Sequence, residues 1–247
     1  MSRAVSGRRV SSARLERLES RVFLSANLGT NLLTNPGAED GQSSSTGDTV
    51  VVPEWTQLTL GSNTVTVVPY GAPGFISDED PGPTDRGDNF FTGGKFARSE
   101  VQQSVDVTNL AVDINAGRIH YDFSAFLGGL ANEGDGVEIK LQFFRGPFSL
   151  AGSAIVFNPP DRQGVTKLVQ QNTSGIIAAG AVVAQINMAF TRAFGTNNDG
   201  YADNLSLVLS SSLGSKGQII GSVRDDKDGD GAIETGEPGA QRRAGVH

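Results

Sequence analysis

Residues 137–143 read Val137-Glu138-Ile139-Lys140-Leu141-Gln142-Phe143, with an apolar side chain at every second position. An amphipathic helix would repeat its apolar residues every three or four positions, whereas a strand with one buried face repeats them every two. The same period of two recurs in residues 119–124, 182–191 and 205–210. These four runs predict antiparallel strands that lay one apolar face on a core.

The segments between these runs are rich in glycine, proline, asparagine and aspartate, which mark turns. Shorter strands are expected near residues 64–69, 101–108, 152–157 and 165–171. Many short strands with this punctuation predict an all-β fold, a jelly-roll β-sandwich, and not a parallel α/β sheet. Residues 174–181 are the one segment that could pass for a helix, but their glycines and Ile-Ile pair fit a turn followed by a strand at least as well.

Composition excludes several classes of function. The 247 residues are 37% hydrophobic, contain no cysteine and only two histidines, and carry a formal net charge of -7. Disulfides, thiolate metal sites and cysteine nucleophiles are therefore absent, and histidine chemistry has little to work with. The acidic balance argues against nucleic acid as a partner. No transmembrane helix is expected, because no stretch holds about 18 consecutive apolar residues.

Residues 1–27 differ from the rest, since they carry six arginines against two glutamates. This composition fits either a targeting segment or a disordered basic leader. Arg17–Ala26 resembles the LEPR-XLL motif found near the N-terminus of large exported bacterial proteins, with Ser20 in place of the motif's proline. The resemblance implies an extracellular or cell-surface protein. We expect residues 1–27 to be a leader that is disordered or processed, and residues 28–212 to be the β-sandwich.

Three segments of this body form a further pattern: Asn31-Leu32-Leu33-Thr34-Asn35-Pro36-Gly37-Ala38-Glu39, Val52-Pro53-Glu54-Trp55, and Asn198–Leu207. They resemble the galactose-binding-like jelly roll of carbohydrate-binding modules. The resemblance implies that the first and last strands are neighbours, that Trp55 lies in the core, and that Glu39 and Asp203 hold a structural calcium ion. Two carboxylates plus turn carbonyls would suit calcium. The alternative is that Asn35-Pro36-Gly37 is only a turn and Asp203 a cap at the start of a strand.

Sugar binding requires aromatic platforms and a few polar groups. Trp55 and Tyr121 are expected in the core, and Tyr201 belongs to the closing motif. Tyr70, in the loop at residues 69–75, is therefore the candidate ligand-binding residue. The acidic segment 77–88 is expected to be a solvated loop and not a site.

The tail contains a calcium-loop motif at residues 226–237. Its ligands at loop positions 1, 3, 5, 7, 9 and 12 would be Asp226, Asp228, Asp230, Ala232, Glu234 and Glu237. Gly231 stands where such a loop needs its sharp turn, and Ile233 where it needs an apolar anchor. Carboxylates this close together repel one another without a cation, so the motif favours bound calcium over an acidic linker.

The flanks of this loop are not those of an EF-hand. Residues 218–223 read as a strand and Pro238 follows the loop directly, which argues against an exiting helix. The arrangement resembles the start of the calcium-stabilised B-type repeat of serine-aspartate-repeat (SdrD-like) surface adhesins. We expect residues 213–217 to be a linker and residues 218–247 a truncated repeat, because the chain stops where the repeat's second strand should begin. The sequence would then be a fragment, a frameshifted product or a vestige.

These observations predict a non-catalytic, calcium-stabilised extracellular module whose partner is a glycan or another surface protein. The alternatives are a structural surface component without a small ligand, or an accessory part of a polysaccharide hydrolase or of a dockerin-type scaffold. No nucleophile motif or histidine pair supports an enzyme. Asp135 with Glu138, or Asp199 with Asp203, could be proposed as an acid/base pair, but the first is expected to cap a loop and the second to lie at the ion.

Overall fold

The structure is a computed structural model that describes residues 26–58 and 64–212. The chain divides into two units, residues 1–211 and 212–247, and the description below concerns the first. The LEPR-XLL-like leader up to residue 25 and the calcium loop at residues 226–237 lie outside the described residues, as do the linker and the strand expected before that loop.

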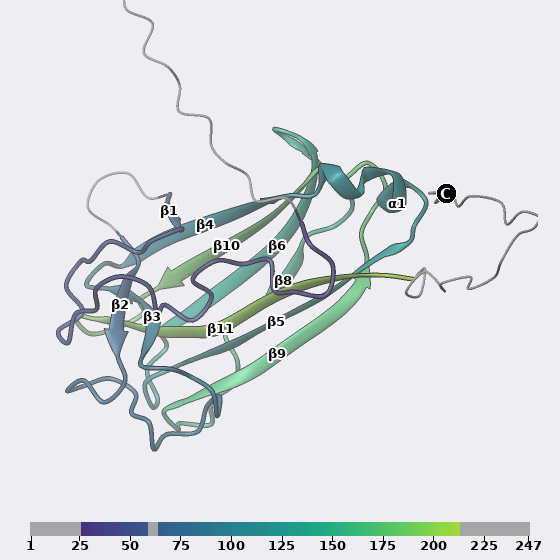
Figure 1. The fold of residues 1–247 in the computed structure, drawn as a ribbon. Helices are drawn as coiled ribbons and strands as arrows, with labels where there is room; N and C mark the ends of the chain where they lie inside the picture. Colours follow the sequence, from purple (N-terminus) through teal and green to yellow (C-terminus); the bar gives the residue numbers. More distant parts are fainter. Residues whose placement is uncertain (1–25, 59–63, 213–247) are drawn as a thin grey trace, which may run out of the picture. The chain divides into compact units, whose positions relative to one another are not determined.

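Two antiparallel sheets make up the body (Figure 1). One sheet has the order β1-β4-β10-β6-β7, with β8 also paired to β6. Its strands are β1 (Thr56–Gln57), β4 (Arg98–Asp106), β6 (Gly136–Gly146), β7 (Ser149–Leu150), β8 (Ile155–Phe157) and β10 (Val183–Thr191). The other sheet has the order β2-β3-β11-β5-β9. Its strands are β2 (Thr66–Pro69), β3 (Asn89–Gly94), β5 (Ile119–Gly129), β9 (Lys167–Ile176) and β11 (Asn198–Ser211). A short turn of 3-10 helix (Thr108–Leu110) leads into α1 (Ala111–Asn115). The predicted all-β jelly-roll β-sandwich is confirmed.

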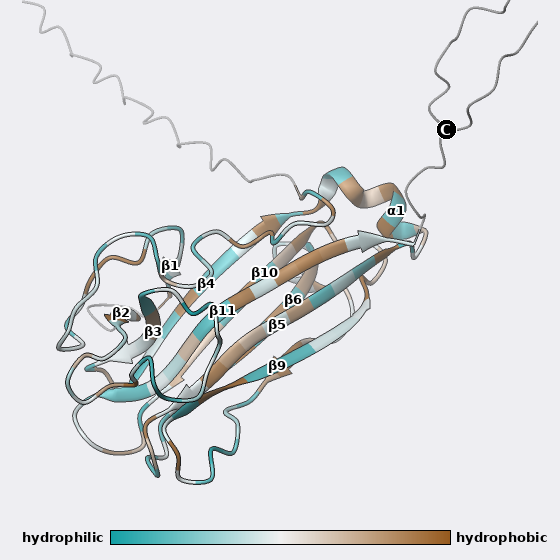
Figure 2. Cartoon of the chain, turned by 60° about the horizontal axis from the view of Figure 1, so that its bottom comes forward, coloured by the Kyte–Doolittle hydropathy of each residue, from teal (hydrophilic) through white to brown (hydrophobic). Residues whose placement is uncertain are grey.

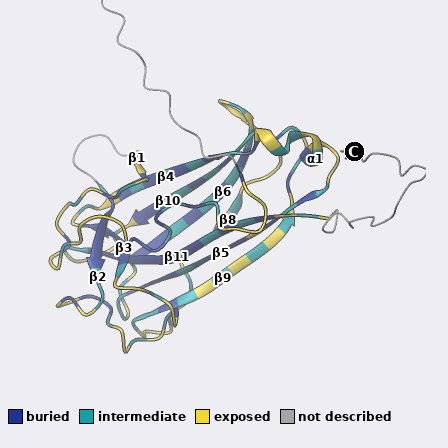
Figure 3. Ribbon diagram, in the orientation of Figure 1, coloured by how far each residue is buried: buried dark blue, intermediate teal, exposed yellow. Residues whose placement is uncertain are grey.

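The alternation that predicted these strands decides which side chains fill the core. In β6 the side chains of Val137, Ile139, Leu141 and Phe143 are buried, whereas those between them are partly exposed. The register continues across the sheet, since Leu141 lies opposite Ile186 of β10. Figure 2 shows hydrophobic residues recurring along the strands, and Figure 3 shows exposed residues alternating with partly buried ones along β9.

Two segments depart from simple alternation. Residues 174–181 form no helix, because β9 continues to Ile176 and a turn at residues 179–180 then leads toward β10. The interpretation as a turn before a strand is correct for the second half of the segment, whereas residues 174–176 end the preceding strand. The strand β3 was not predicted, because all but its first residue are buried and no period of two is visible. Phe91 of β3 points into the core between the sheets, while Phe90 packs in a second cluster with Phe75 and Tyr201. A strand covered on both faces reads as continuous apolar sequence.

The start of the body pairs with its last strand, as the jelly-roll resemblance implied. Asn31 forms a bridge with Val208, and the Gly29 backbone N–H donates to the carbonyl of Leu209. The register of β11 shifts between Asp203 and Ser206. The Asn31 side chain fills the edge of this bulge, because its amide donates to the Leu205 carbonyl and its oxygen accepts from the Leu207 N–H.

Trp55 lies in the core, as expected. Its side chain is 5% exposed, its Nε1–H donates to the carbonyl of Asn35 at 3.1 Å, and its ring meets Phe91 edge-on. Among the described residues no helix has the length and apolar content needed to cross a membrane.

Candidate functional site

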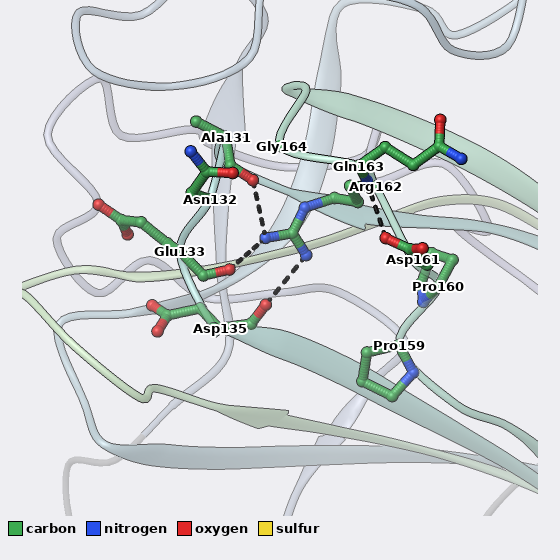
Figure 4. A pocket seen from close by; sticks show the side chains of 11 residues that line it. Ala131, Asn132, Glu133, Asp135, Pro159, Pro160, Asp161, Arg162, Gln163 and Gly164 are labelled. Atoms are coloured by element: carbon green, nitrogen blue, oxygen red, sulfur yellow. Dashed lines mark hydrogen bonds between the residues drawn. The ribbon is translucent and has the colours of Figure 1, made fainter.

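A pocket opens where β5 ends and β9 begins. Because these strands are antiparallel, with Gly129 opposite Lys167, the loop that follows β5 meets the loop that precedes β9. Residues 131–135 and 159–164 line a hollow of about 330 Å³ between the two loops (Figure 4). Connecting loops at the end of a rigid sandwich are common positions for binding sites.

Arg162 organises the pocket from within. Its side chain is 7% exposed, and its guanidinium donates to backbone carbonyls of the loop that wraps around it (Figure 4). Nη1 donates to the Asp135 carbonyl at 3.2 Å, and Nη2 donates to the carbonyl of Glu133 and, at 3.4 Å, to that of Leu130. A guanidinium offers donors in a fixed plane, so it holds several carbonyls in one arrangement. Arg162 therefore shapes the loop at residues 130–135.

Two glycines make room for this arrangement. A Cβ at Gly129 would lie 2.9 Å from Arg162 Cζ and 2.5 Å from the carbonyl oxygen of Asp199. A Cβ at Gly128 would lie 1.8 Å from the carbonyl oxygen of Lys167. Neither position tolerates a side chain without a backbone shift, because real Cβ atoms do not approach backbone atoms so closely.

Asp135 fixes the neighbouring loop that follows β10. Its side chain is 1% exposed, and Oδ1 accepts from the backbone N–H groups of Ala193 at 2.6 Å and Phe194 at 3.2 Å. Its Oδ2 accepts from the N–H of Asp199 at 2.8 Å. The expected loop-capping role of Asp135 is confirmed, and Glu138 takes no part in it, because it forms an ion pair with Lys140.

Three carboxylates meet beside Arg162. One oxygen from each of Glu133, Asp135 and Asp199 lies within 4.8 Å of the others. Burial and the adjacent Glu133 raise the pKa of Asp199 to about 7, although the Tyr201 hydroxyl donates to it. The Oε2 atom of Glu133 is buried and has no hydrogen-bond partner among the described residues. Asp199 therefore holds a proton more readily than an exposed aspartate does. Among the described residues, Glu133, Asp135 and Asp199 are the group whose carboxylate oxygens lie close enough together to hold a cation.

Phe194 lies beside the pocket, next to Gly134, without being one of its lining residues. Its side chain is 70% exposed, and its ring lies 3.6 Å from the position of a Cβ at Gly134, which lines the hollow. The Asp135 carboxylate accepts from the backbone N–H of Phe194, so a buried group holds the chain from which this ring projects.

The structure brings the sequence-predicted Glu39 and Asp203 to one region but gives each a protein partner. The Glu39 carboxylate accepts from the N–H groups of Asp88 and Asn89 at 3.0–3.2 Å. Asp203 is fully buried and accepts from the Tyr70 hydroxyl at 2.7 Å and the Asn204 N–H at 2.7 Å. Burial raises the pKa of Asp203 to about 8, even though the Tyr70 hydroxyl and the Asn204 N–H oppose that rise.

Calcium fits this region in part. The Oδ1 atoms of Asp203 and Asn204 each lie 3.3 Å from the position of a Cβ at Gly37, so the missing side chain leaves a cradle bordered by two oxygens. The Cγ of Glu39 borders the same space at 3.9 Å, but its carboxylate faces backbone N–H groups, which are not neighbours for a cation. An ion here would use Asp203 and Asn204 directly, and Glu39 only after it releases a donor.

Tyr70 is the most exposed of the three tyrosines, as predicted, because Tyr121 and Tyr201 are buried. Its hydroxyl is nevertheless bound to Asp203, and its ring packs against Phe90 with the Arg86 guanidinium 5.0 Å from the ring centroid. Desolvation raises the pKa of the Tyr70 hydroxyl, so the group stays protonated and donates. A role for Tyr70 in ligand binding stays a prediction.

Sequence reasoning missed the loop pocket. Asp135 and Asp199 were considered, each with a neighbour in the sequence, but the structure joins them to one another across 64 positions. An arginine in a polar loop carries no periodic signal, and neither does an exposed phenylalanine. The Gly128-Gly129 pair was the one available sign of a close backbone approach.

No protein-family model matches the chain, and no curated protein matches it in sequence. Several solved structures share its fold. A cyclase from Fischerella sp. TAU is similar with a TM-score of 0.50 and 11% identity, over 75% of this chain and 98% of the cyclase. TmCBM61, solved with β-1,4-galactotriose, is similar with a TM-score of 0.42 and 15% identity, over 73% of this chain and 99% of the module.

The enzymatically active domain of the bacteriophage CBA120 tailspike protein 4 is similar with a TM-score of 0.45 and 15% identity, over 73% of this chain. The chain corresponds to only 22% of that tailspike chain. Binding modules and enzymes both occur among these structures, so the likeness describes the architecture alone. A function for this chain has to be argued from its own side chains.

Proposed function

We propose that the chain is a non-catalytic saccharide-binding module and that the pocket between residues 131–135 and 159–164 holds the sugar. The observation that carries the proposal is an exposed phenylalanine ring beside a polar hollow. The ring of Phe194 offers a flat apolar surface, and the amide side chains of Asn132 and Gln163 line the hollow next to it. A sugar ring has apolar C–H groups on its face, which stack on an aromatic ring, and hydroxyl groups around its edge, which bind polar side chains.

The chemistry of the lining supports a neutral sugar. Amide groups both donate and accept hydrogen bonds, as sugar hydroxyls do. The carboxylates of Glu133 and Asp161 accept only, and they would repel an acidic sugar. Arg162 does not offset this repulsion at the surface, because its guanidinium is buried and used on backbone carbonyls.

A glycan array followed by calorimetric titration with the tightest-binding oligosaccharide tests the proposal. Phe194→Ala and Gln163→Ala should each weaken binding about tenfold, the effect of losing one stacking ring or one good hydrogen bond to a ligand. Phe148→Ala is the matched control, since Phe148 is 99% exposed on the hairpin between β6 and β7 and lines no part of the pocket. Unchanged affinity in both pocket variants, or no binding to any glycan, would contradict the proposal.

We further propose that calcium stabilises the chain at two places. In the body, the fully buried Asp203 supports this, because a buried carboxylate is either protonated or paired with a cation, and the cradle at Gly37 is bordered by two side-chain oxygens. In the tail, the spacing of Asp226–Glu237 supports it. Chelator should then lower the melting temperature of the full chain, and an unchanged melting curve would count against the ion in the body.

An extracellular position follows from the leader's resemblance to LEPR-XLL proteins, and we propose it on that ground. Calcium concentrations outside cells are high enough to fill sites of modest affinity. Detection of the protein in the medium or on the cell surface of its host, and not in the cytoplasm, is the corresponding test.

A further inference from the structure

A second surface, separate from the loop pocket, lies on the outer face of the sheet β2-β3-β11-β5-β9. Two adjoining hollows of about 430 Å³ and 270 Å³ share Ser124, Gln170 and Ser206 in their linings. Together they form a groove across β11, β5 and β9. The turn at Pro36 and the loop at Thr84 and Asp85 line one end of the groove.

Polar side chains occur in the groove in rows set by the sheet register. Ser206, Ser124 and Asn172 lie opposite one another on three neighbouring strands, and Asp122 lies opposite Ser174 in the next row. Gln170 lies opposite Phe126 in the row on the other side, so the groove also contains an aromatic ring. Rows two residues apart repeat about every 7 Å along a strand, and three rows extend about 13 Å.

These polar side chains have no partners within the described part of the chain. Gln170 and Asn172 are exposed, and neither they nor Ser124 and Ser206 make a side-chain hydrogen bond there. In the floor of the groove, β5 is paired with β11 and β9, and β11 is paired with β3 and β5, so the backbones of both strands are used. The groove therefore offers hydrogen-bonding side chains on its floor, and a peptide strand could be added to the sheet only at the outer edge of β9, beside the groove.

The charge of the groove limits its ligands further. Asp85 and Asp122 are the charged residues in the two linings, and no lysine or arginine belongs to them. A polyanion such as a uronate or sulfated chain would meet repulsion without a compensating cation. Serine hydroxyls and carboxamides both donate and accept, which matches an uncharged chain rich in hydroxyls.

We infer that this groove binds an extended, uncharged polysaccharide chain. It is a different site from the loop pocket, so one molecule would contact a polysaccharide at two places. Simultaneous contacts strengthen attachment to a polymer beyond either site alone, but not attachment to a monosaccharide that reaches only one of them.

The test is calorimetric titration of the full chain with hexasaccharides of neutral β-1,4-linked glucan, galactan, mannan and xylan, beside hexagalacturonate. All titrations use the Phe194→Ala background, so that the loop pocket does not dominate. Gln170→Ala with Asn172→Ala should weaken binding of the preferred neutral hexasaccharide at least tenfold. The matched control is Gln185→Ala with Asn187→Ala, which removes the same two residue types from the outer face of the other sheet. This control should leave the affinity for the hexasaccharide unchanged.

Three results would overturn the inference: equal affinity in the groove variant and the parent, stronger binding of hexagalacturonate than of every neutral chain, or a concentration-dependent dimer that the groove variant abolishes. The last result would assign the groove to a second copy of the chain. Failure of the loop-pocket proposal gives a different pattern, in which Phe194→Ala leaves sugar binding intact while the groove variant still weakens it.

Discussion

Replacing Asp203 with asparagine should change how the stability of the chain depends on pH. Burial raises the pKa of Asp203 to about 8, whereas an aspartate in the unfolded chain titrates near 4. Between these values the folded chain keeps a proton that the unfolded chain has lost. The folded state then binds more protons, so the free energy of unfolding falls as the pH rises.

The magnitude follows from that difference. One such group lowers the free energy of unfolding by about 1.4 kcal/mol for each pH unit between about pH 4 and pH 8. At pH 7 the accumulated loss is up to about 4 kcal/mol. Asparagine resembles the protonated acid and keeps a partner for the Tyr70 hydroxyl, so Asp203→Asn should match the parent chain near pH 4 and exceed its stability by up to about 4 kcal/mol at pH 7.

Urea unfolding in chelator between pH 4.5 and pH 7 measures this difference. Trp55 is the single tryptophan and is 5% exposed, so its fluorescence reports the core. Some pH dependence should persist in the variant, because the pKa of Asp199 is also raised, to about 7. Asp122→Asn makes the same substitution at an exposed position and is the matched control. If Asp203→Asn has the same slope as the parent, the argument from burial is refuted.

The remaining predictions concern the close packing at Gly129, the hydrogen bonds of Arg162, the hydrogen bond of Tyr70, and the tail. Gly129→Ala should cost about 2 kcal/mol of unfolding free energy in urea, because its Cβ would overlap Arg162 and the Asp199 carbonyl. Arg162→Met should cost about 3 kcal/mol and make residues 130–135 exchange amide hydrogens faster; unchanged exchange would contradict its organising role. Tyr70→Phe should cost about 1 kcal/mol, and no loss at pH 7 would deny the bond to Asp203. Asp226→Ala with Glu237→Ala should remove one site in a calcium titration of the full chain, and equal stoichiometry would exclude the tail loop.

The sheets were predictable because their signal is local. Each of β5, β6, β10 and β11 shows its own apolar period, whereas the burial of Trp55 was inferred from a family resemblance. The strand β3 was missed for a physical reason, since both of its faces are covered and covering elements are not visible in the strand itself. The pairing of Asn31 with the end of β11 was inferred only through a family resemblance.

The loops were less predictable because their order depends on single side chains. Residues 77–88 were expected to be a solvated acidic loop, yet Arg86 donates to the carbonyls of Ser77, Asp80 and Pro83 and gives that loop a defined centre. The sequence shows that an arginine stands at position 86, but it does not show that the side chain turns back onto the carbonyls of its own loop. The same limit applies to Arg162 and to the meeting of Asp135 with Asp199, which depends on how three loops close.

The hydrogen bonds of Arg162 also bear on how the loop at residues 130–135 responds to its surroundings. Arg162 does in this loop what a bound metal ion does in many binding loops, since it gathers backbone oxygens around a positive charge. A metal ion is in equilibrium with the medium, so dilution or competing chelators empty its site. A guanidinium on a covalent tether has no dissociation constant. The loop at residues 130–135 should therefore keep its shape in calcium-poor water, whereas an ion bound at residues 226–237, as proposed, would dissociate there.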